Sequence, residues 1–263
     1  MLDELIDQTV RRARECVFFT DFDGTLATIQ DDPETVWPVP GAKAALTLLS
    51  EAVARVCVVS GRPVTFLRSR FGDISAIRLF GQYGMESFCD GRLAVDPAAA
   101  RFRPVIAELA QRAYAELPAE VMIEEKGIAL SLHYRNAPYA KREIERWSRR
   151  AAQATGTAIQ EGRMVVELKP PDGPNKGDII IAETDGLRCG WYFGDDISDI
   201  WAFRALKQRA AVDQDFLAVS VAVHNPESGE HVAENADMVL GSPAEVGVLM
   251  RRVADAITSR AAG

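Results

Sequence analysis

The sequence predicts an α/β protein in which a parallel sheet covered by helices receives a smaller α+β insertion. Three observations support this prediction. Short apolar runs alternate with helical segments in the first hundred residues, the same alternation returns after residue 171, and the stretch between them has the pattern of a β-hairpin. Strands that are apolar throughout, rather than at every second residue, are typical of a parallel sheet buried on both faces.

The first part of the chain supplies three apolar strands with helices between them. The helical spacing of Leu2, Ile6 and Val10 predicts a first helix. In order, we expect a helix at 2–14, a strand at 16–20, a helix at 41–53, a strand at 56–60, a helix at 63–70 and a strand at 77–80. This regular alternation favours one continuous parallel sheet.

The last part resumes the pattern, whereas the middle differs. We expect a short helix at 178–182, strands at 191–193, 218–223 and 238–240, and an amphipathic final helix ending near residue 257. In the middle, two β-prone segments flank Gly127 within residues 120–134, and a helix at 140–155 and a strand at 164–168 follow. Pro104 and the Pro170-Pro171 pair suit linkers. The expected division is core 1–100, insertion 101–170 and core 171–263.

Composition and charge exclude several classes of protein. The chain has 263 residues and a formal net charge of −8, which argues against binding nucleic acid through cationic contacts to phosphates. No apolar run approaches the roughly 20 residues of a membrane helix. The charged N-terminal segment, residues 1–15, has no apolar stretch like that of a signal peptide. We therefore expect a cytoplasmic protein with no membrane partner, as a monomer or weak oligomer.

The cysteines and histidines do not form a metal-binding pattern. Cys16, Cys57 and Cys189 lie in or beside apolar runs, and the four cysteines show no Cys-x-x-Cys pair. Buried free thiols are the expected state. With only three histidines, the composition also argues against a zinc site.

Two acidic motifs follow predicted buried strands. Asp21 and Asp23 come directly after the strand at 16–20, and Asp195, Asp196 and Asp199 follow the strand at 191–193. Carboxylates gathered at a strand end repel one another, and a divalent cation would relieve that cost. Hard oxygen ligands suit Mg²⁺. The alternatives are an ordinary surface loop for the first motif and a helix cap for one aspartate of the second.

Two further motifs could bind an anion. Ser60, Gly61 and Arg62 follow the strand at 56–60, where the hydroxyl and the exposed amides could hold a phosphate, or where Ser60 could cap a helix. Lys176 opens the predicted helix at 178–182, an unfavourable place for a cation in the helix dipole. An anion within reach of the Lys176 ammonium would explain this position, and the alternative is that Lys176 is a solvated surface lysine. We expect all four motifs at the carboxyl ends of strands, where open parallel sheets bind ligands.

Taken together and in this order, the four motifs resemble those of the haloacid-dehalogenase superfamily of phosphotransferases. The matching stretches are DFDGTL at 21–26, SGR at 60–62, NKG at 175–177 and GDDISD at 194–199. The resemblance implies a Rossmann-like parallel core of the haloacid-dehalogenase type, with the inserted α+β domain as a cap. It also implies a phosphatase that uses Mg²⁺ and passes through an aspartyl-phosphate.

The insertion narrows the resemblance to trehalose-6-phosphate phosphatases. The stretches that carry it are GQYGME at 81–86, EEKG at 124–127, LSLHYR at 130–135 and GRMVVELKP at 162–170. The chain departs from the family pattern at Ile200, where an acidic residue is usual, and at Ser198, where threonine is usual. Neither change removes a group that the chemistry requires.

The resemblance implies a role for each motif residue. Asp21 would attack phosphorus, Asp23 would act as the general acid and base, and Lys176 would stabilise the transferred phosphoryl group. The metal would be held by Asp21, the main chain of Asp23 and Asp195, with Asp196 and Asp199 in support. The substrate-binding residues would be Ser60, Gly61, Arg62, Lys126, His133, Arg135 and Glu167. His133 and Arg135 could instead form the solvent-exposed face of a strand, and Lys126 could belong to an ordinary polar stretch at the hairpin.

Three other functions stay open at this point. The chain could hydrolyse another sugar phosphate, such as sucrose phosphate or a glycosyl-phosphoglycerate. It could be a phosphomutase, which would retain the phosphoryl group. It could also be an inactive sugar-phosphate sensor, although such modules commonly lose one of the two aspartates that this chain keeps at 21 and 23.

Overall fold

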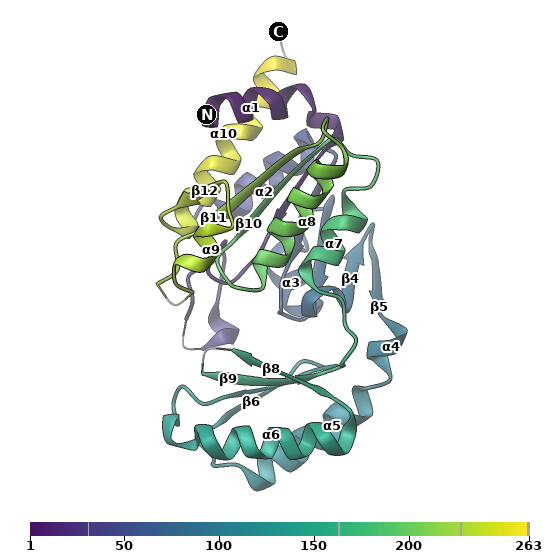
Figure 1. The fold of residues 1–263 in the computed structure, drawn as a ribbon, viewed down its shortest axis with the longest axis vertical. Helices are drawn as coiled ribbons and strands as arrows, with labels where there is room; N and C mark the ends of the chain where they lie inside the picture. Colours follow the sequence, from purple (N-terminus) through teal and green to yellow (C-terminus); the bar gives the residue numbers. More distant parts are fainter. Residues whose placement is uncertain (31, 163, 227, 262–263) are drawn as a thin grey trace. The chain divides into compact units, whose positions relative to one another are not determined.

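The computed structural model describes residues 1–30, 32–162, 164–226 and 228–261. The chain forms two compact units (Figure 1). The larger unit comprises Met1–Leu93 and Pro174–Gly263, and the smaller unit comprises Ala94–Gly173. The sequence-based division placed these boundaries after residues 100 and 170. Arg163, which belongs to one of the motifs above, lies outside the described residues.

The larger unit is built on an eight-stranded sheet in the order β12-β11-β10-β1-β2-β3-β4-β5. β1 lies between β10 and β2 and runs parallel to both, so that Thr20 pairs with Phe193 on one side and Val58 on the other. The carboxyl ends of these three strands are therefore level with one another. The strands are β1 (Cys16–Thr20), β2 (Arg55–Val59), β3 (Ile77–Gly81), β4 (Glu86–Cys89), β5 (Arg92–Val95), β10 (Cys189–Gly194), β11 (Leu217–Val223) and β12 (Met238–Leu240).

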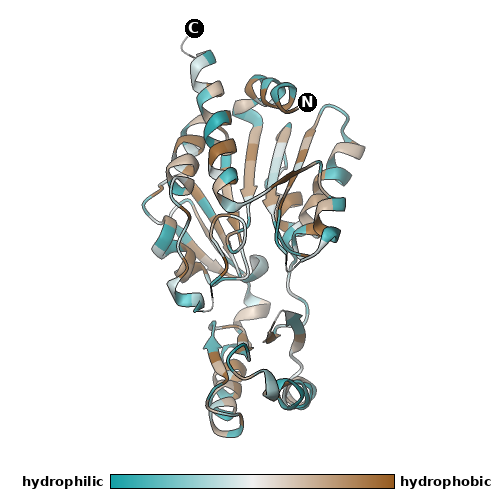
Figure 2. Cartoon of the chain, turned by 90° about the vertical axis from the view of Figure 1, so that its left-hand side faces the viewer, coloured by the Kyte–Doolittle hydropathy of each residue, from teal (hydrophilic) through white to brown (hydrophobic). Residues whose placement is uncertain are grey.

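Helices cover both faces of this sheet, as the apolar strands predicted. Successive strand residues point to opposite faces, so Phe18 joins one apolar core and Phe19 joins the other. The first core contains residues of α1 (Leu2–Arg11), α2 (Ala42–Ala52), α3 (Val64–Phe71) and α10 (Pro243–Ala261), and the second contains residues of α7 (Lys176–Glu183), α8 (Asp199–Val212) and α9 (Glu230–Glu234). Hydropathy colouring shows the hydrophobic strands lying between these helices (Figure 2).

One edge of the sheet corrects the expectation of a wholly parallel arrangement. β4 runs antiparallel to β3, with Phe80 opposite Ser87. Asp90 and Gly91 both have positive φ, and this Asp-Gly turn leads from β4 to β5. β4 and β5 were not predicted because their residues are mostly half-buried or exposed, so they lack the continuous apolar character of the inner strands.

The smaller unit is a four-stranded antiparallel sheet in the order β6-β7-β9-β8. Its strands are β6 (Met122–Glu125), β7 (Leu130–His133), β8 (Ala158–Gly162) and β9 (Val165–Lys169), and its helices are α4 (Pro97–Ala100), α5 (Arg103–Glu116) and α6 (Lys141–Thr155). The predicted hairpin is confirmed, with Gly127 at φ +79° in its turn. Apolar residues of α5 and α6 pack with Leu130, Leu132 and Leu168, so these helices cover one face of the sheet.

Two smaller expectations can also be compared with the structure. The helix predicted over residues 2–14 ends at Arg11, because Ala13–Glu15 forms a 3-10 turn before β1. The thiols of Cys16, Cys57 and Cys189 are free and buried, as expected. Among the described helices, none combines the length and the apolar character needed to cross a bilayer.

Candidate active site

Carboxylates from two distant stretches of the chain meet at the carboxyl ends of β1 and β10. Asp21 follows β1, and its N–H donates to the carbonyl oxygen of Phe193 in β10 over 2.9 Å. Asp195 follows β10 directly. Side-chain oxygens of Asp21, Asp195 and Asp199 lie within 4.8 Å of one another, and all three residues are buried. The two loops therefore lie side by side, which is the geometry that the sequence-based hypothesis requires.

Lys176 lies within this group of carboxylates. Its Nζ is 2.6 Å from Oδ1 of Asp199 and 3.0 Å from Oδ2 of Asp21. The lysine side chain is only 2% exposed. The structure thus excludes a solvated surface lysine and gives the ammonium two anionic partners, which offset its unfavourable place at a helix start.

The start of α7 fixes the position of Lys176. Asn175 accepts a hydrogen bond from the N–H of Gly177 (2.8 Å), and Asp178 accepts one from the N–H of Asn175 (2.8 Å). This capping box orders the first turn of the helix. The expectation that all four motifs end strands of the core sheet is wrong here, because Lys176 opens α7 after the chain returns from the smaller unit.

Burial and charge shift the pKa values of Asp21, Asp195 and Lys176. Burial raises the pKa of Asp21 well above its ordinary value, opposed by Lys176 and reinforced by the neighbouring carboxylates. Burial, followed by the charge of Asp199, raises the pKa of Asp195 to about 7. Burial alone would lower the pKa of Lys176, but Asp199 and Asp21 raise it well above its ordinary value, so the ammonium stays charged.

The excess of negative charge in the ion group around Lys176 suits the binding of a divalent cation. One buried ammonium faces three buried carboxylates, an excess of negative charge that a low-dielectric site does not tolerate without a partner. The donor atoms are all carboxylate oxygens, the ligands that hard cations such as Mg²⁺ prefer. The residues present therefore suit a divalent metal, with Asp21 and Asp195 as its side-chain donors.

Two hydrogen bonds hold the side chain of Asp195, which also lies close to Gly24. Thr25 donates to its Oδ1 over 3.0 Å, and the side-chain amide of Asn225 donates to its Oδ2 over 2.7 Å. Gly24 has φ +76°, and a Cβ at that position would lie 2.0 Å from Oδ2 of Asp195. Only glycine therefore permits both the turn after Asp21 and the close approach of the second loop.

Asp23 is paired with an arginine. The guanidinium of Arg62 donates from two nitrogens to both carboxylate oxygens of Asp23, over 2.8 and 2.7 Å. The same guanidinium lies 4.5 Å from the centre of the Phe66 ring. Such a bidentate contact is among the stronger ion pairs in proteins. The side chain of Asp23 thus contacts Arg62, while Asp21, Asp195 and Asp199 form the oxygen cluster.

The loop containing Gln82 and Tyr83, whose backbone is strained, holds the turn at Ser60 through hydrogen bonds. Ser60 is buried and accepts a hydrogen bond from the N–H of Arg62 over 3.2 Å. The N–H groups of Gln82 and Tyr83 donate to the carbonyls of Arg62 (2.9 Å) and Ser60 (3.0 Å). Both Gln82 and Tyr83 have positive φ, and Tyr83 lies so close to Gly61 that a Cβ there would be 2.8 Å from its hydroxyl. Strain of this kind commonly accompanies a functional loop.

The residues that end the second acidic motif serve different purposes. Asp196 is exposed, and its Oδ1 accepts a hydrogen bond from the N–H of Ile197 over 2.7 Å. Ile200, where the family pattern has an acidic residue, is buried in the core that α7 and α8 share. The departure at Ile200 therefore adds apolar packing and leaves the oxygen cluster intact.

The smaller unit gathers its polar residues on the sheet face opposite α5 and α6. Nζ of Lys126 is 2.7 Å from Oε2 of Glu167, and Ser131 donates to the same oxygen over 2.8 Å. His133 pairs with Glu124 over 2.8 Å. These strand residues alternate with the apolar residues that face the helices.

Arg135 continues that alternation just beyond β7, two residues after His133. The predicted site residues therefore form two groups, one in each unit: an ion group around Lys176 in the larger unit, and a polar sheet face around Glu167 in the smaller one.

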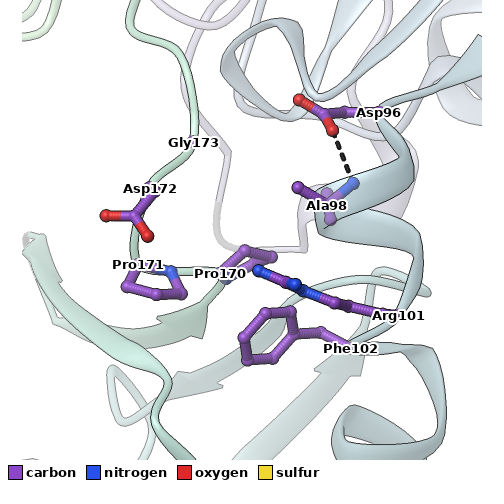
Figure 3. A pocket seen from close by; sticks show the side chains of 9 residues that line it. Asp96, Ala98, Arg101, Phe102, Pro170, Pro171, Asp172 and Gly173 are labelled. Atoms are coloured by element: carbon purple, nitrogen blue, oxygen red, sulfur yellow. Dashed lines mark hydrogen bonds between the residues drawn. The ribbon is translucent and has the colours of Figure 1, made fainter.

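A separate small pocket lies in the smaller unit, beside the two segments where this unit begins and ends (Figure 3). Its volume of about 10 Å³ is enough for one water molecule at most. Asp96 caps α4 there by accepting a hydrogen bond from the N–H of Ala98 over 2.7 Å. The lining residues are Asp96, Ala98, Ala99, Arg101, Phe102, Pro170, Pro171, Asp172 and Gly173.

Three residues of the ion group were given no role from the sequence, although Thr25 lies within the DFDGTL motif. Thr25 and Asn225 hold Asp195, and Tyr192 donates to Oδ1 of Asp199 over 2.6 Å. Burial, followed by the charge of Asp199, raises the pKa of Tyr192 well above its ordinary value, so its hydroxyl stays protonated. Asn225 follows β11, and the rule that ligands gather at strand ends could have found it. Nothing in the sequence pattern distinguishes Tyr192 from an ordinary core residue.

Comparisons with known proteins agree with this geometry. A family model described as Trehalose-phosphatase matches residues 19–236. A trehalose-phosphate phosphatase of Mycolicibacterium paratuberculosis is 34% identical over 253 residues, which are 92% of this chain and 63% of that protein. The chain thus spans slightly less than two thirds of the length of this relative.

Solved structures show the same fold. A protein described as related to trehalose-6-phosphate phosphatase superimposes with a TM-score of 0.78 at 22% identity, over 93% of this chain and 99% of that one. The C-terminal domain of a trehalose-6-phosphate phosphatase of C. albicans gives a TM-score of 0.76 at 22% identity, over 97% and 96% of the two chains. With the family model covering most of its length, this chain belongs to the trehalose-phosphatase family.

Proposed function

We propose that this chain hydrolyses trehalose 6-phosphate to trehalose and inorganic phosphate, with Mg²⁺ as its cofactor. The observation that carries the proposal is the buried ion group in which Lys176 contacts both Asp21 and Asp199, next to Asp195. Membership of the trehalose-phosphatase family supports the choice of reaction, and the names of the relatives support the choice of sugar.

Mg²⁺ would be held by the side chains of Asp21 and Asp195 and by the main-chain carbonyl of Asp23, with Asp196 and Asp199 in support. The three clustered carboxylates and the raised pKa of Asp195 support this assignment. When bound, the metal would neutralise charge on the phosphate oxygens and reduce their repulsion of the attacking carboxylate.

In the first step, a carboxylate oxygen of Asp21 attacks phosphorus and the bond from phosphorus to the sugar oxygen breaks. Asp23, in its protonated form, gives its proton to the departing sugar oxygen. Lys176 and Ser60 stabilise the negative charge on the phosphoryl oxygens, the main requirement of phosphoryl transfer. The product is trehalose and an aspartyl-phosphate on Asp21.

In the second step, water attacks phosphorus and gives a proton to Asp23, while the bond between phosphorus and Asp21 breaks. Inorganic phosphate leaves and both aspartates return to their starting state. Arg62 donates one hydrogen bond to each carboxylate oxygen of Asp23, and each oxygen keeps a second position at which Asp23 can exchange a proton with the substrate.

The smaller unit, Ala94–Gly173, would act as the cap that recognises the sugar, in the place of the insertion predicted at 101–170. Lys126, His133, Arg135 and Glu167 would contact its hydroxyl groups, with Ser60, Gly61 and Arg62 on the phosphate side. The ordered contacts of Lys126 with Glu167 and of His133 with Glu124 support this role, because a sugar site needs fixed polar groups. The cytoplasmic location and the state of monomer or weak oligomer stay predictions.

The deciding experiment is phosphate release from trehalose 6-phosphate, measured with Mg²⁺ and again after chelation. We expect turnover with the metal and loss of turnover without it. A panel containing sucrose phosphate and a glycosyl-phosphoglycerate tests the sugar, and faster turnover of either one would reject trehalose 6-phosphate as the substrate. Transfer of phosphate to another sugar position without release would indicate a mutase, and no turnover of any phosphate ester would indicate a sensor.

A further inference from the structure

The carboxylate of Asp199 is saturated by four hydrogen-bond donors. Its Oδ1 accepts from Nζ of Lys176 (2.6 Å) and from the hydroxyl of Tyr192 (2.6 Å). Its Oδ2 accepts from the N–H groups of Asp195 (3.0 Å) and Asp196 (2.9 Å). Two carboxylate oxygens offer about four acceptor positions. Asp199 therefore ties Lys176 and Tyr192 to the loop that carries Asp195.

The ring of Tyr192 is fixed on both sides. It stacks on Phe19 with ring centres 6.3 Å apart and meets the edge of Phe203 at 5.7 Å. Both Tyr192 and Asp199 are completely buried. Its hydroxyl therefore has little freedom to move.

We propose that Tyr192 is a positioning residue for the phosphoryl transfer proposed above, acting through Asp199 on Lys176. The hydroxyl shares Oδ1 of Asp199 with the ammonium, so that this oxygen attracts Lys176 less strongly than an unshared carboxylate oxygen would. The ammonium then also reaches Asp21, 3.0 Å away. Without the hydroxyl, Asp199 would draw the ammonium toward itself and away from the oxygen that attacks phosphorus.

The neighbouring residue of the same strand provides a contrast. Trp191 points to the opposite face of β10, and its Nε1 donates to the hydroxyl of Thr9 over 3.0 Å. The hydrogen bond between Trp191 and Thr9 is buried, like the one between Tyr192 and Asp199, and it also joins an aromatic side chain to a single polar partner. It lies in the core formed with α1, however, apart from the ion group. Thr9→Val is therefore a matched variant that removes a buried hydroxyl without touching the ion group.

The test compares Tyr192→Phe with Thr9→Val, using trehalose 6-phosphate and an aryl phosphate with saturating Mg²⁺. For Tyr192→Phe we expect kcat to fall about tenfold, the size of one hydrogen bond to a charged group, with KM unchanged within about twofold. Inhibition by orthovanadate, which mimics the phosphoryl group in transfer, should weaken by a similar factor. Thr9→Val should keep kcat and vanadate inhibition while its Tm falls.

A Tyr192→Phe enzyme with unchanged kcat, or one whose loss matches that of Thr9→Val, would overturn the proposal. The wild type is measured first, because absence of turnover there rejects the proposed function and not the role of Tyr192. If the wild type shows no turnover, the affinity for orthovanadate, measured by calorimetry, tests the role of Tyr192 instead. Weaker binding by Tyr192→Phe than by Thr9→Val supports the positioning role, and equal binding rejects it.

Discussion

The two units both gather charged side chains, but they do so in different ways. In the larger unit, Asp21, Lys176 and Asp195 come from three separate segments and meet in a buried group at the ends of parallel strands. In the smaller unit, Lys126 and Glu167 contact each other across the surface of an antiparallel sheet. Buried and saturated contacts suit chemistry, which requires fixed geometry, whereas a sheet face with several polar groups suits recognition of a sugar. Substitutions in the two units should therefore separate effects on chemistry from effects on sugar recognition.

The largest effect is expected from Asp21→Asn. The amide cannot act as the nucleophile, so kcat should fall by about 10⁴-fold or more in a phosphate-release assay. Since the change also removes one of three mutually repelling carboxylates, Tm should stay the same or rise. Asp73→Asn, at an exposed ion pair with Lys43, is the control and should alter neither quantity measurably. Residual turnover within tenfold of wild type, with deamidation excluded by mass spectrometry, would end the assignment of Asp21.

A pair of glycine variants separates backbone strain from damage to the ion group. Gly24 and Gly156 have nearly equal φ, +76° and +73°, but only at Gly24 would a Cβ meet Asp195, while nothing lies within 4 Å at Gly156. Gly24→Ala should lose at least about 100-fold in kcat/KM at limiting Mg²⁺, because the metal-binding loop is displaced. Gly156→Ala should cost about 1 kcal/mol of stability and no activity. Equal losses of activity would contradict the crowding at Asp195.

The stability of the metal-free protein should fall as pH rises. Asp195 has a pKa of about 7 in the folded state, above its ordinary 3.8, so the folded state binds more protons between these values. The stabilisation is complete below about pH 4 and is lost as pH rises through about 7, a change on the order of a few kcal/mol.

Mg²⁺ should oppose this loss because it binds the ionised carboxylates. Thermal unfolding at pH 5.5 and pH 8, with chelator or with Mg²⁺, measures both effects. Asp195→Asn should show a smaller pH dependence than the wild type and a smaller gain from Mg²⁺. A metal-free protein that is more stable at pH 8 than at pH 5.5 would contradict the assignment.

The smallest effect is expected in the smaller unit. Glu167→Gln weakens the contact with Lys126, so KM for trehalose 6-phosphate should rise about tenfold while kcat/KM for an aryl phosphate stays constant. Glu161→Gln, at an exposed position of β8, is the control and should change neither value. Equal losses for both substrates would assign Glu167 to the chemistry or the fold and not to sugar recognition.

Much of the fold could be predicted because the inner strands carry a strong apolar signal. Residues 16–20, 56–60 and 191–193 were located within one or two residues at most boundaries. β5 and β8 are edge strands, and β4 lies next to the edge; all three were missed because they are only partly buried and their alternation is weak. The antiparallel turn at Asp90-Gly91 could have been found from its residue types alone.

The charged residues of the candidate site could be predicted, but some of their partners could not. The acidic motif residues were found because carboxylates gathered beside buried apolar runs repel one another unless a partner offsets their charge. Tyr192 could not be found, because its hydroxyl matters only through the partner that the fold brings to it. The pairing of Asp23 with Arg62 was also hidden, since it joins two loops whose distance is set by the order of β1 and β2.

The position of β1 between β2 and β10 has a consequence for the newly made chain. Its second neighbour is encoded about 170 residues later, after the entire smaller unit. Until that strand has left the ribosome, the fully buried strand β1 has an open edge that invites wrong pairing. The N-terminal segment is therefore made well before its partners, and Asp21 cannot contact Lys176, Asp195 or Asp199 until the last third of the polypeptide is synthesised.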